Sequence, residues 1–215
     1  MTSHPAGPAK GAELSFIHRF MPGASGATLL VLHGTGGDEN DLLPLARKLS
    51  PEANLLSPRG PVLENGMPRF FRRIAIGVFD EADLQRRAAD LAAFVAEAAR
   101  AYRFEPARVF AFGYSNGANI AAELLLLHPD TLAGAALLRA VMPLEPTRAP
   151  SLVGKPVFIA AGLEDEYAPR PRVEALAERL KRGGATVELR WAAAGHGLED
   201  RELNAVQDWV ARHVR

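Results

Sequence analysis

The sequence predicts an α/β fold built on a doubly wound, mostly parallel sheet of about seven strands. Strand-like and helix-like segments alternate along the chain, which is the pattern of parallel strands joined by crossover helices. Several strand-like segments are continuous apolar runs, as expected for strands that are buried on both faces of a sheet. The chain has 215 residues, a length that a single domain of this class often reaches.

The predicted strands are short and rich in apolar residues. The clearest is ATLLVL at 27–32, a continuous apolar run that ends at His33-Gly34. The first one is expected to be an outer strand. The predicted strands span residues 14–20, 27–32, 54–57, 108–112, 133–138, 157–161 and 186–191.

The predicted helices show apolar residues at spacings of three and four. The clearest spans 83–103, where Leu84, Leu91 and Val95 fall on one face. The other helices span 41–49, 116–128, 172–182 and 201–213. A long loop is expected at 60–78. About 18 residues separate the strand near Leu138 from the strand near Val157, which leaves no room for a large cap domain.

Composition and charge exclude several classes of function. With 25 basic and 25 acidic residues the net charge is zero, so we expect no nucleic-acid partner. The chain has no cysteine, which excludes disulfides, thiolate metal sites and a cysteine nucleophile. No apolar run approaches the ~20 residues of a membrane helix, so we expect no membrane span. We expect a flexible tail at 1–12, one domain at 13–215 and, without a signal peptide, a cytoplasmic location.

One motif indicates a catalytic serine. Gly113-Tyr114-Ser115-Asn116-Gly117 is a G-x-S-x-G sequence between a predicted strand and a predicted helix. This is the context that the nucleophile elbow of an α/β-hydrolase requires, because the serine must occupy a sharp turn with small residues on either side. An ordinary glycine-flanked turn is the alternative. The motif in this context predicts Ser115 as the nucleophile.

The base that this serine needs is expected after it in the chain, preceded by an acid. His128 lies at the far end of the helix that begins at the serine, and His213 lies in the last helix, as expected for a solvated residue. His196 follows a predicted strand, where open α/β sheets place their sites. His196 is therefore the predicted base.

The acid is expected in the turn after the strand at 157–161. This turn, Gly162-Leu163-Glu164-Asp165-Glu166, offers three carboxylates. Asp165 is preferred, with the role of fixing the tautomer of the histidine and stabilising the imidazolium. Glu164 and Glu166 stay open, because spacing alone cannot separate them.

Two backbone N–H groups are expected to bind the oxyanion of the tetrahedral intermediate. One belongs to Asn116, the residue after the nucleophile. The other is assigned to Thr35 in the segment His33-Gly34-Thr35-Gly36-Gly37, where glycines let the backbone approach a substrate closely. A phosphate-binding loop is the rival interpretation, but no lysine follows in the required arrangement and G-x-G-x-x-G is absent.

These motifs together resemble the small carboxylesterase/phospholipase family of α/β-hydrolases, which also contains acyl-protein thioesterases. The resemblance covers nearly the whole chain after the tail and is closest to a bacterial subgroup of the MhqD/YahD type. It rests on LHGTGGDENDL, SPRGPVLENGMPRFFRR, GYSNGANIA, the GLED turn and AAAGHGL. The resemblance implies an α/β-hydrolase fold, a triad of Ser115, Asp165 and His196, and an oxyanion N–H from Thr35.

Two departures from the family pattern bear on the substrate. Better-studied relatives have G-F-S-Q-G at the elbow, and this chain has Gly-Tyr-Ser-Asn-Gly. A loop that is apolar in thioesterases carries Arg69, Arg72 and Arg73 here, which disfavours long-chain thioesters and phospholipids. We hypothesise that one of these arginines faces the cleft and binds an acidic group of the substrate, because guanidinium matches carboxylate geometry. Solvated or structural arginines are the alternative.

The leading functional hypothesis is a serine carboxylesterase that hydrolyses small or medium esters through an acyl-enzyme, without cofactor or metal. His33 and His196 have no further ligand at helical spacing, as a metal site would need. A lactone or dienelactone hydrolase ranks lower, because such enzymes use a cysteine nucleophile. A non-catalytic hydrolase fold that only binds ligands is the third hypothesis. The expected partner is a small-molecule ester, and an exposed edge strand with the last helix could form a homodimer.

Overall fold

The computed structural model describes residues 14–144 and 150–215, so the tail expected at 1–12 lies outside the described residues. Its main feature is a seven-stranded sheet with the order β1-β3-β2-β8-β9-β10-β11. β1 is antiparallel to β3, and every other neighbouring pair is parallel. The strands are β1 (His18–Met21), β2 (Thr28–Leu32), β3 (Asn54–Pro58), β8 (Val109–Tyr114), β9 (Gly134–Leu138), β10 (Pro156–Gly162) and β11 (Thr186–Ala192).

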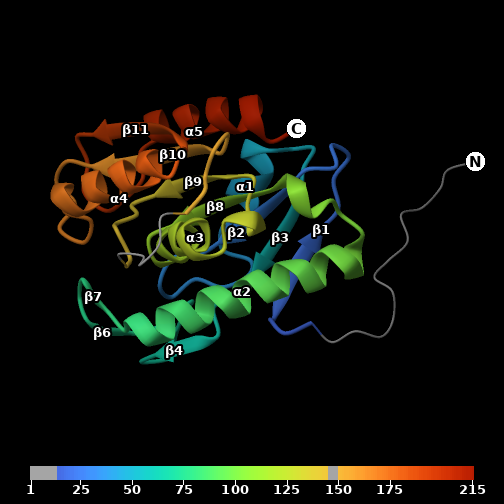
Figure 1. Cartoon of the computed structure of the whole chain (residues 1–215), viewed down its shortest axis with the longest axis horizontal. Coiled ribbons are helices and arrows are strands. Elements are labelled where there is room, and N and C mark those ends of the chain that lie inside the picture. Colours follow the sequence, from blue (N-terminus) through green and yellow to red (C-terminus); the bar gives the residue numbers. More distant parts are fainter. Residues whose placement is uncertain (1–13, 145–149) are drawn as a thin grey trace, which may run out of the picture.

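Helices cover both faces of this sheet (Figure 1). α2, α3 and α4 pack into the hydrophobic core on one face, and α1 and α5 pack into the core on the other. The helices are α1 (Leu43–Leu49), α2 (Glu81–Tyr102), α3 (Asn116–Leu127), α4 (Arg170–Arg182) and α5 (Asp200–His213), with short 3-10 turns η1 (Pro106–Arg108) and η2 (Pro129–Thr131). The predicted doubly wound, mostly parallel sheet is therefore confirmed. The described residues between β9 and β10 contain no helix or strand, in agreement with the absence of a large cap domain.

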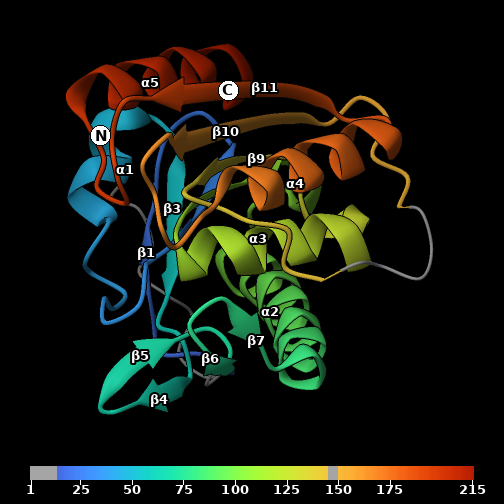
Figure 2. The ribbon, with the colours of Figure 1, turned by 90° about the vertical axis from the view of Figure 1, so that its left-hand side faces the viewer.

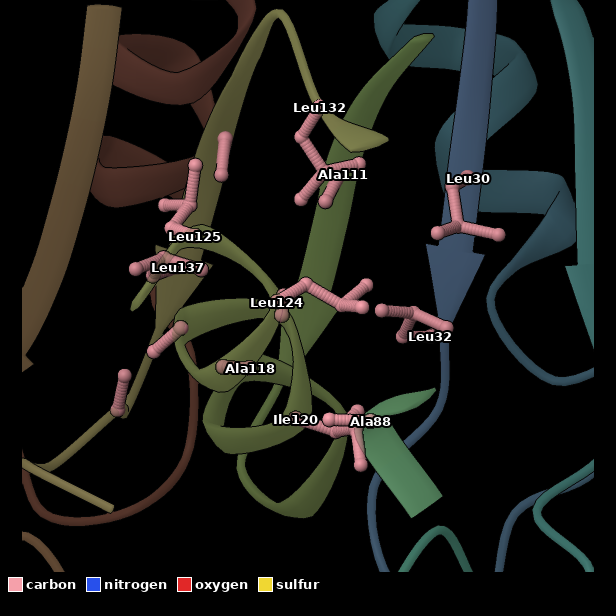
Figure 3. Close-up of a cluster of buried hydrophobic side chains, with 14 of the residues drawn as sticks. Leu30, Leu32, Ala88, Ala111, Ala118, Ile120, Leu124, Leu125, Leu132 and Leu137 are labelled. Atoms are coloured by element: carbon pink, nitrogen blue, oxygen red, sulfur yellow. The ribbon is translucent and has the colours of Figure 1, made fainter. Parts of the chain in front are cut away.

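The larger core is built around α3, whose residues from Asn116 to Leu126 are all buried. Figure 3 shows side chains of α3, among them Ile120 and Leu124, between the sheet residues Leu32 and Leu137 and Ala88 of α2. A helix that is apolar on all sides is stable only when it is covered on all sides. Each fully buried leucine stabilises the fold by roughly 2 kcal/mol, and α3 therefore fixes the position of the turn at its beginning.

The segment predicted as a long loop at 60–78 contains two small hairpins instead. β4 (Val62–Glu64) pairs with β5 (Met67–Arg69), and β6 (Arg73–Ala75) pairs with β7 (Val78–Phe79). Asn65-Gly66 turns the first hairpin with positive φ angles of 51° and 78°, as this residue pair favours. Figure 2 shows both hairpins near the beginning of α2, away from the sheet.

The first strand also differs from its prediction. It begins at His18 rather than at residue 14, because the preceding residues leave the sheet and pack against α2. Phe16 is buried there, and Ser15 donates hydrogen bonds from its N–H and its hydroxyl to Glu97.

None of the helices in the described part of the chain combines the length and apolar character that a membrane crossing requires.

Candidate active site

The predicted site residues lie in loops at the carboxyl ends of three parallel strands. Ser115 follows β8, Asp165 follows β10 and His196 follows β11. β9 lies between β8 and β10 in the sheet. Because these strands run in the same direction, their carboxyl ends meet at one edge, where open α/β sheets present their ligand sites.

The backbone at Ser115 has the strained conformation of a sharp strand-to-helix turn. Its φ of 52° and ψ of −114° lie in a region that residues other than glycine rarely adopt. A Cβ atom at Gly113 would lie 2.7 Å from the Gly117 carbonyl oxygen, and one at Gly117 would lie 2.1 Å from the Leu32 carbonyl oxygen. Close packing of the turn against β2 and α3 therefore requires glycine on both sides of the serine.

Ser115, His196 and Asp165 form one chain of hydrogen bonds. His196 Nε2 lies 2.8 Å from Ser115 Oγ, and His196 Nδ1 lies 2.8 Å from Asp165 Oδ2 and 3.0 Å from Oδ1. With the proton on Nδ1, the ring donates to the carboxylate and Nε2 is free to accept the serine proton. This arrangement can activate a hydroxyl for attack on a carbonyl carbon.

The structure separates Asp165 from the two neighbouring glutamates. The Asp165 side chain is fully buried, whereas Glu164 and Glu166 are exposed. Its Oδ1 also accepts hydrogen bonds of 2.9 and 3.1 Å from two backbone N–H groups of the following turn, which compensates for the burial of its charge. Of these three carboxylates, Asp165 is the one that contacts His196.

Arg139 is a residue of the site that no motif revealed. It follows β9, is fully buried and has a φ of 60°. Its guanidinium donates hydrogen bonds to the two carbonyl oxygens on either side of His196, and it binds both carboxylate oxygens of Glu202 in α5 at 2.6 and 2.8 Å. Its Nε also lies 3.9 Å from Asp165 Oδ2. The signal in the sequence is its position directly after an apolar strand, where a lone arginine is unusual.

The two predicted oxyanion donors, Thr35 and Asn116, line the same small cavity as Ser115. Within the ranges 14–144 and 150–215, neither backbone N–H donates to another group, so both are available to an incoming oxygen atom. Both residues are tied to the hairpin segment. The Phe70 N–H donates to Asn116 Oδ1 at 2.7 Å, and Arg69 Nη1 donates to Thr35 Oγ1 at 2.7 Å.

The loop that carries Thr35 is anchored by His33. The Nδ1 atom of His33 lies 2.7 Å from the Gly34 carbonyl oxygen, and the Gly60 N–H donates to Nε2 at 2.9 Å. This pattern needs one protonated and one unprotonated ring nitrogen, so the ring is neutral. Burial lowers the pKa of His33, which favours the same form. His33 therefore holds the loop in place, a role that the sequence did not indicate.

The structure treats the three predicted arginines differently. A cavity of about 50 Å³ above Ser115 and His196 is lined by Arg69 and Arg73. Arg72 does not line it, and its exposed guanidinium pairs with Asp80, at the beginning of α2, at 3.0 Å. The structure thus brings two of the three arginines to the site and directs the third away from it.

Several residues of the cavity wall are less polar. Ile76, Gly77 and Phe79 from the second hairpin line it together with Tyr167. Ile76 is 65 % exposed, so this lining residue is in contact with solvent. The site therefore combines apolar side chains, arginine side chains and a serine hydroxyl that is hydrogen-bonded to an imidazole.

Comparisons with known proteins agree with this architecture. A family model described as phospholipase/carboxylesterase matches residues 23–214. MhqD of Bacillus subtilis strain 168, a protein named as a hydrolase, is 46% identical over 197 residues, which cover 92% of this chain and 98% of that protein. The crystal structure of the Bacillus cereus carboxylesterase has a TM-score of 0.89 at 44% identity and covers 94% of this chain and 95% of its own. The structure of YahD with malic acid has a TM-score of 0.86 at 28% identity, with 91% and 98% covered.

Proposed function

The chain belongs to the phospholipase/carboxylesterase family of α/β-hydrolases, and from this premise we propose that it is a serine carboxylesterase acting on small or medium esters through an acyl-enzyme. The observation that carries the proposal is the hydrogen-bonded chain from Ser115 through His196 to Asp165. The strained elbow at the serine and the two available N–H groups beside it support the same assignment.

In the proposed reaction, Ser115 Oγ forms a bond to the ester carbonyl carbon while His196 Nε2 takes the hydroxyl proton. The carbonyl oxygen becomes an oxyanion that the N–H groups of Thr35 and Asn116 stabilise. His196 then gives the proton to the departing alcohol, which leaves the acyl group on the serine. A water molecule attacks this acyl-enzyme by the same steps, releases the carboxylic acid and restores the hydroxyl. Asp165 remains ionised and stabilises the imidazolium in both halves.

The size of the cavity supports a short substrate. Its volume is about 50 Å³, whereas pockets that enclose drug-sized ligands have roughly 300–1,000 Å³. A short acyl group fits such a space, whereas a long chain would extend beyond it. The similarity to the YahD structure with malic acid also supports a small, polar ligand.

The experiment that tests the proposal is labelling by a fluorophosphonate probe, combined with hydrolysis of p-nitrophenyl esters of increasing acyl length. We expect Ser115 to be labelled, and the rate to fall from acetyl and butyryl to octanoyl esters. Ser115→Ala should abolish labelling and lower kcat by about 10⁴-fold or more. Ser151→Ala, which changes an exposed serine, is the matched control and should change neither.

Two results would overturn the proposal. One is a protein that hydrolyses none of the esters and takes up no probe, which would favour the non-catalytic binding module. The other is equal labelling of the wild type and Ser115→Ala, which would place the reactive group elsewhere.

A cytoplasmic location and a homodimer are further parts of the proposal. The chain has no cysteine and so needs no oxidising compartment for disulfides, and its zero net charge favours a small-molecule partner over a nucleic acid. Cell fractionation and light scattering of the purified protein test the two statements separately.

A further inference from the structure

The cavity above Ser115 has an unequal distribution of charge. Among the described residues that line it are three arginines, and none is an aspartate or a glutamate. One of them, Arg139, is neutralised by its two hydrogen bonds with Glu202. The other two, Arg69 and Arg73, come from the hairpin segment and differ from Arg139 in how their charges are balanced.

Arg69 and Arg73 share a single carboxylate. Arg73 Nε donates to Glu64 Oε1 at 2.9 Å, and Arg69 Nη1 lies 3.3 Å from Glu64 Oε2 without hydrogen-bond geometry. Two positive charges thus face one negative charge, and Glu64 does not line the cavity. The cluster therefore presents a net positive charge to the space above the serine.

Each of the two arginines keeps donors without a partner. Arg69 uses Nη1 for Thr35 Oγ1 and Nε for the Phe71 carbonyl oxygen at 3.2 Å, and its Nη2 has no acceptor among residues 14–144 and 150–215. Arg73 uses Nε alone, and its two Nη atoms have no acceptor in that part of the chain. The Arg69 side chain is only 4 % exposed, so water compensates its charge poorly.

The surroundings of Arg69 disfavour its positive charge unless an anion is bound nearby. Burial is the main cause that lowers the pKa of Arg69, the charge of Arg73 acts in the same direction, and the charge of Glu64 opposes both only in part. A guanidinium that is buried beside a second guanidinium is stabilised by any anion that enters the cavity, and a carboxylate matches the planar arrangement of its donors.

We propose that Arg69 and Arg73 form a subsite for a carboxylate of the substrate, so that the ester cleaved at Ser115 carries an acidic group. This proposal rests on the proposed esterase function. The contact between Arg69 Nη1 and Thr35 Oγ1 places the subsite next to the oxyanion loop. Arg69, Arg73 and Ser115 line the same small cavity, so the carboxylate is expected to lie only a few bonds from the reacting carbonyl. Half-esters of short dicarboxylic acids have this chemistry.

The test compares monoethyl succinate with ethyl 4-methylpentanoate, in which an isopropyl group of similar shape replaces the carboxylate. Acid release is followed in a pH-stat, and the ratio of kcat/KM for the two esters is the readout. We expect the wild-type protein to favour the acidic ester at least tenfold, and Arg73→Gln to lower the ratio at least tenfold. Arg72→Gln, on the same segment but outside the cavity, is the matched control and should leave the ratio unchanged.

A substitution at Glu64 should change the ratio of kcat/KM in the opposite direction to Arg73→Gln. Glu64→Gln removes the carboxylate that competes with the substrate for both arginines, so the ratio should rise. If Glu64→Gln lowers the ratio as Arg73→Gln does, the cluster is only a structural unit and the proposal is wrong. A wild-type ratio near one also overturns it.

The outcomes also separate this proposal from the esterase function. If the protein hydrolyses the neutral ester and Ser115 reacts with a fluorophosphonate probe, while the kcat/KM ratio of the two esters stays near one, only the proposal of the carboxylate subsite is wrong. If neither ester is hydrolysed and the probe does not react, the proposed esterase function itself is wrong.

Discussion

Arg139 connects the parts of the site that lie far apart in the sequence. Its guanidinium binds the backbone on both sides of His196, lies beside Asp165, and is held by Glu202. Because all of these groups are buried or half-buried, each hydrogen bond is difficult for water to replace. Arg139 is thus a positioning residue, which acts on the reaction through the loop of the histidine.

Replacing Arg139 should therefore change kcat more than KM. We expect Arg139→Met to reduce kcat on p-nitrophenyl acetate by about 10–100-fold with a small change in KM, because a displaced base slows the chemical step. It should also destabilise the fold by about 3–5 kcal/mol, because the buried carboxylate of Glu202 loses its partner. Arg139→Lys keeps the charge but not the fork of donors, so its kcat should be intermediate. Steady-state kinetics and urea unfolding measure both effects. An unchanged kcat in Arg139→Met would contradict this role.

Asp165 allows a sharper test of the proposed triad. An amide in place of the carboxylate cannot hold the Nδ1 proton of His196 in the same way, and a comparable change in a serine protease lowers kcat about 10⁴-fold. We expect Asp165→Asn to reduce kcat by about this factor while the protein stays folded by circular dichroism. The neighbouring exposed Glu164→Gln should remain within about twofold of the wild type. Equal losses in the two variants would argue against the assignment of the acid.

At the scale of elements, the site depends on how closely β2, β8 and α3 approach one another. The turn between β8 and α3 lies against the end of β2, where a side chain at Gly117 would overlap two backbone carbonyl groups. A similar contact occurs at the end of β10, where a Cβ atom at Gly162 would lie 2.4 Å from the carbonyl oxygens of Ala194 and Gly195. Glycine at these strand ends lets the loops of the serine, the acid and the histidine converge.

Gly117→Ala should destabilise the protein, because its new methyl group would lie 2.1 Å from the Leu32 carbonyl oxygen. Overpacking of this kind costs about 1–3 kcal/mol, which corresponds to a decrease in Tm of roughly 2–12 °C for a domain of this size. Differential scanning calorimetry measures it. Gly197→Ala is the control, because a Cβ atom there meets nothing within 4 Å, and its Tm should stay within about 2 °C of the wild type. A stable Gly117→Ala variant would show that the turn can relax.

The elements that were predicted correctly are those with a long, simple pattern. The central strands of the main sheet are apolar runs such as 27–32, and α2 has apolar residues at helical spacing, so most of the sheet and the helices could be predicted from the sequence. The hairpins at 62–79 could not, because strands of two or three residues are too short to show alternation. The Asn65-Gly66 pair, which favours a tight turn, is the local signal that could have indicated the first hairpin. The pairing order of the strands depends on tertiary packing and has no local signal.

The candidate site divides in the same way. The convergence of Ser115, His196 and Asp165 at one edge of the sheet could be predicted, because each follows a strand within a recognisable motif, although spacing alone did not separate Asp165 from Glu164 and Glu166. Their catalytic roles stay a prediction. Arg139 was missed, since a single arginine after a strand forms no motif. Arg72 was considered together with Arg69 and Arg73 as a candidate for substrate binding. Its side chain lies outside the cavity because of how the hairpins fold, and the sequence did not reveal these hairpins.

At the scale of the whole molecule, α3 places an ionisable group in the middle of the fold. Glu123 lies within this helix with no exposed surface, and neither of its carboxylate oxygens has a hydrogen-bond partner among the described residues. Burial, with a smaller effect of the nearby Glu81, raises the pKa of Glu123 to about 8. At neutral pH this carboxyl group is therefore protonated in the folded protein and ionised in the unfolded chain.

The folded state should accordingly lose stability as the pH rises. Between the ordinary pKa of 4.5 and the raised pKa of about 8, the folded protein binds one proton more than the unfolded chain. The free energy of unfolding then falls by roughly 1 kcal/mol for each pH unit on account of this group, and the loss is complete above pH 8. Glu123→Gln removes the dependence. We expect the free energy of unfolding of the variant, measured in urea, to increase relative to that of the wild type between pH 5.5 and pH 8.5. A constant difference between the two proteins would show that Glu123 is not protonated in the folded state.

The bond between Arg139 and Glu202 also bears on when the protein becomes active during its synthesis. Glu202 lies in α5, the last helix to be translated among those that cover the sheet. A nascent chain that has already left the ribosome tunnel as far as His196 contains every residue of the proposed triad, but it lacks Glu202, which holds the Arg139 guanidinium beside the histidine loop. Full activity is therefore expected only after α5 has emerged and Glu202 has bound Arg139.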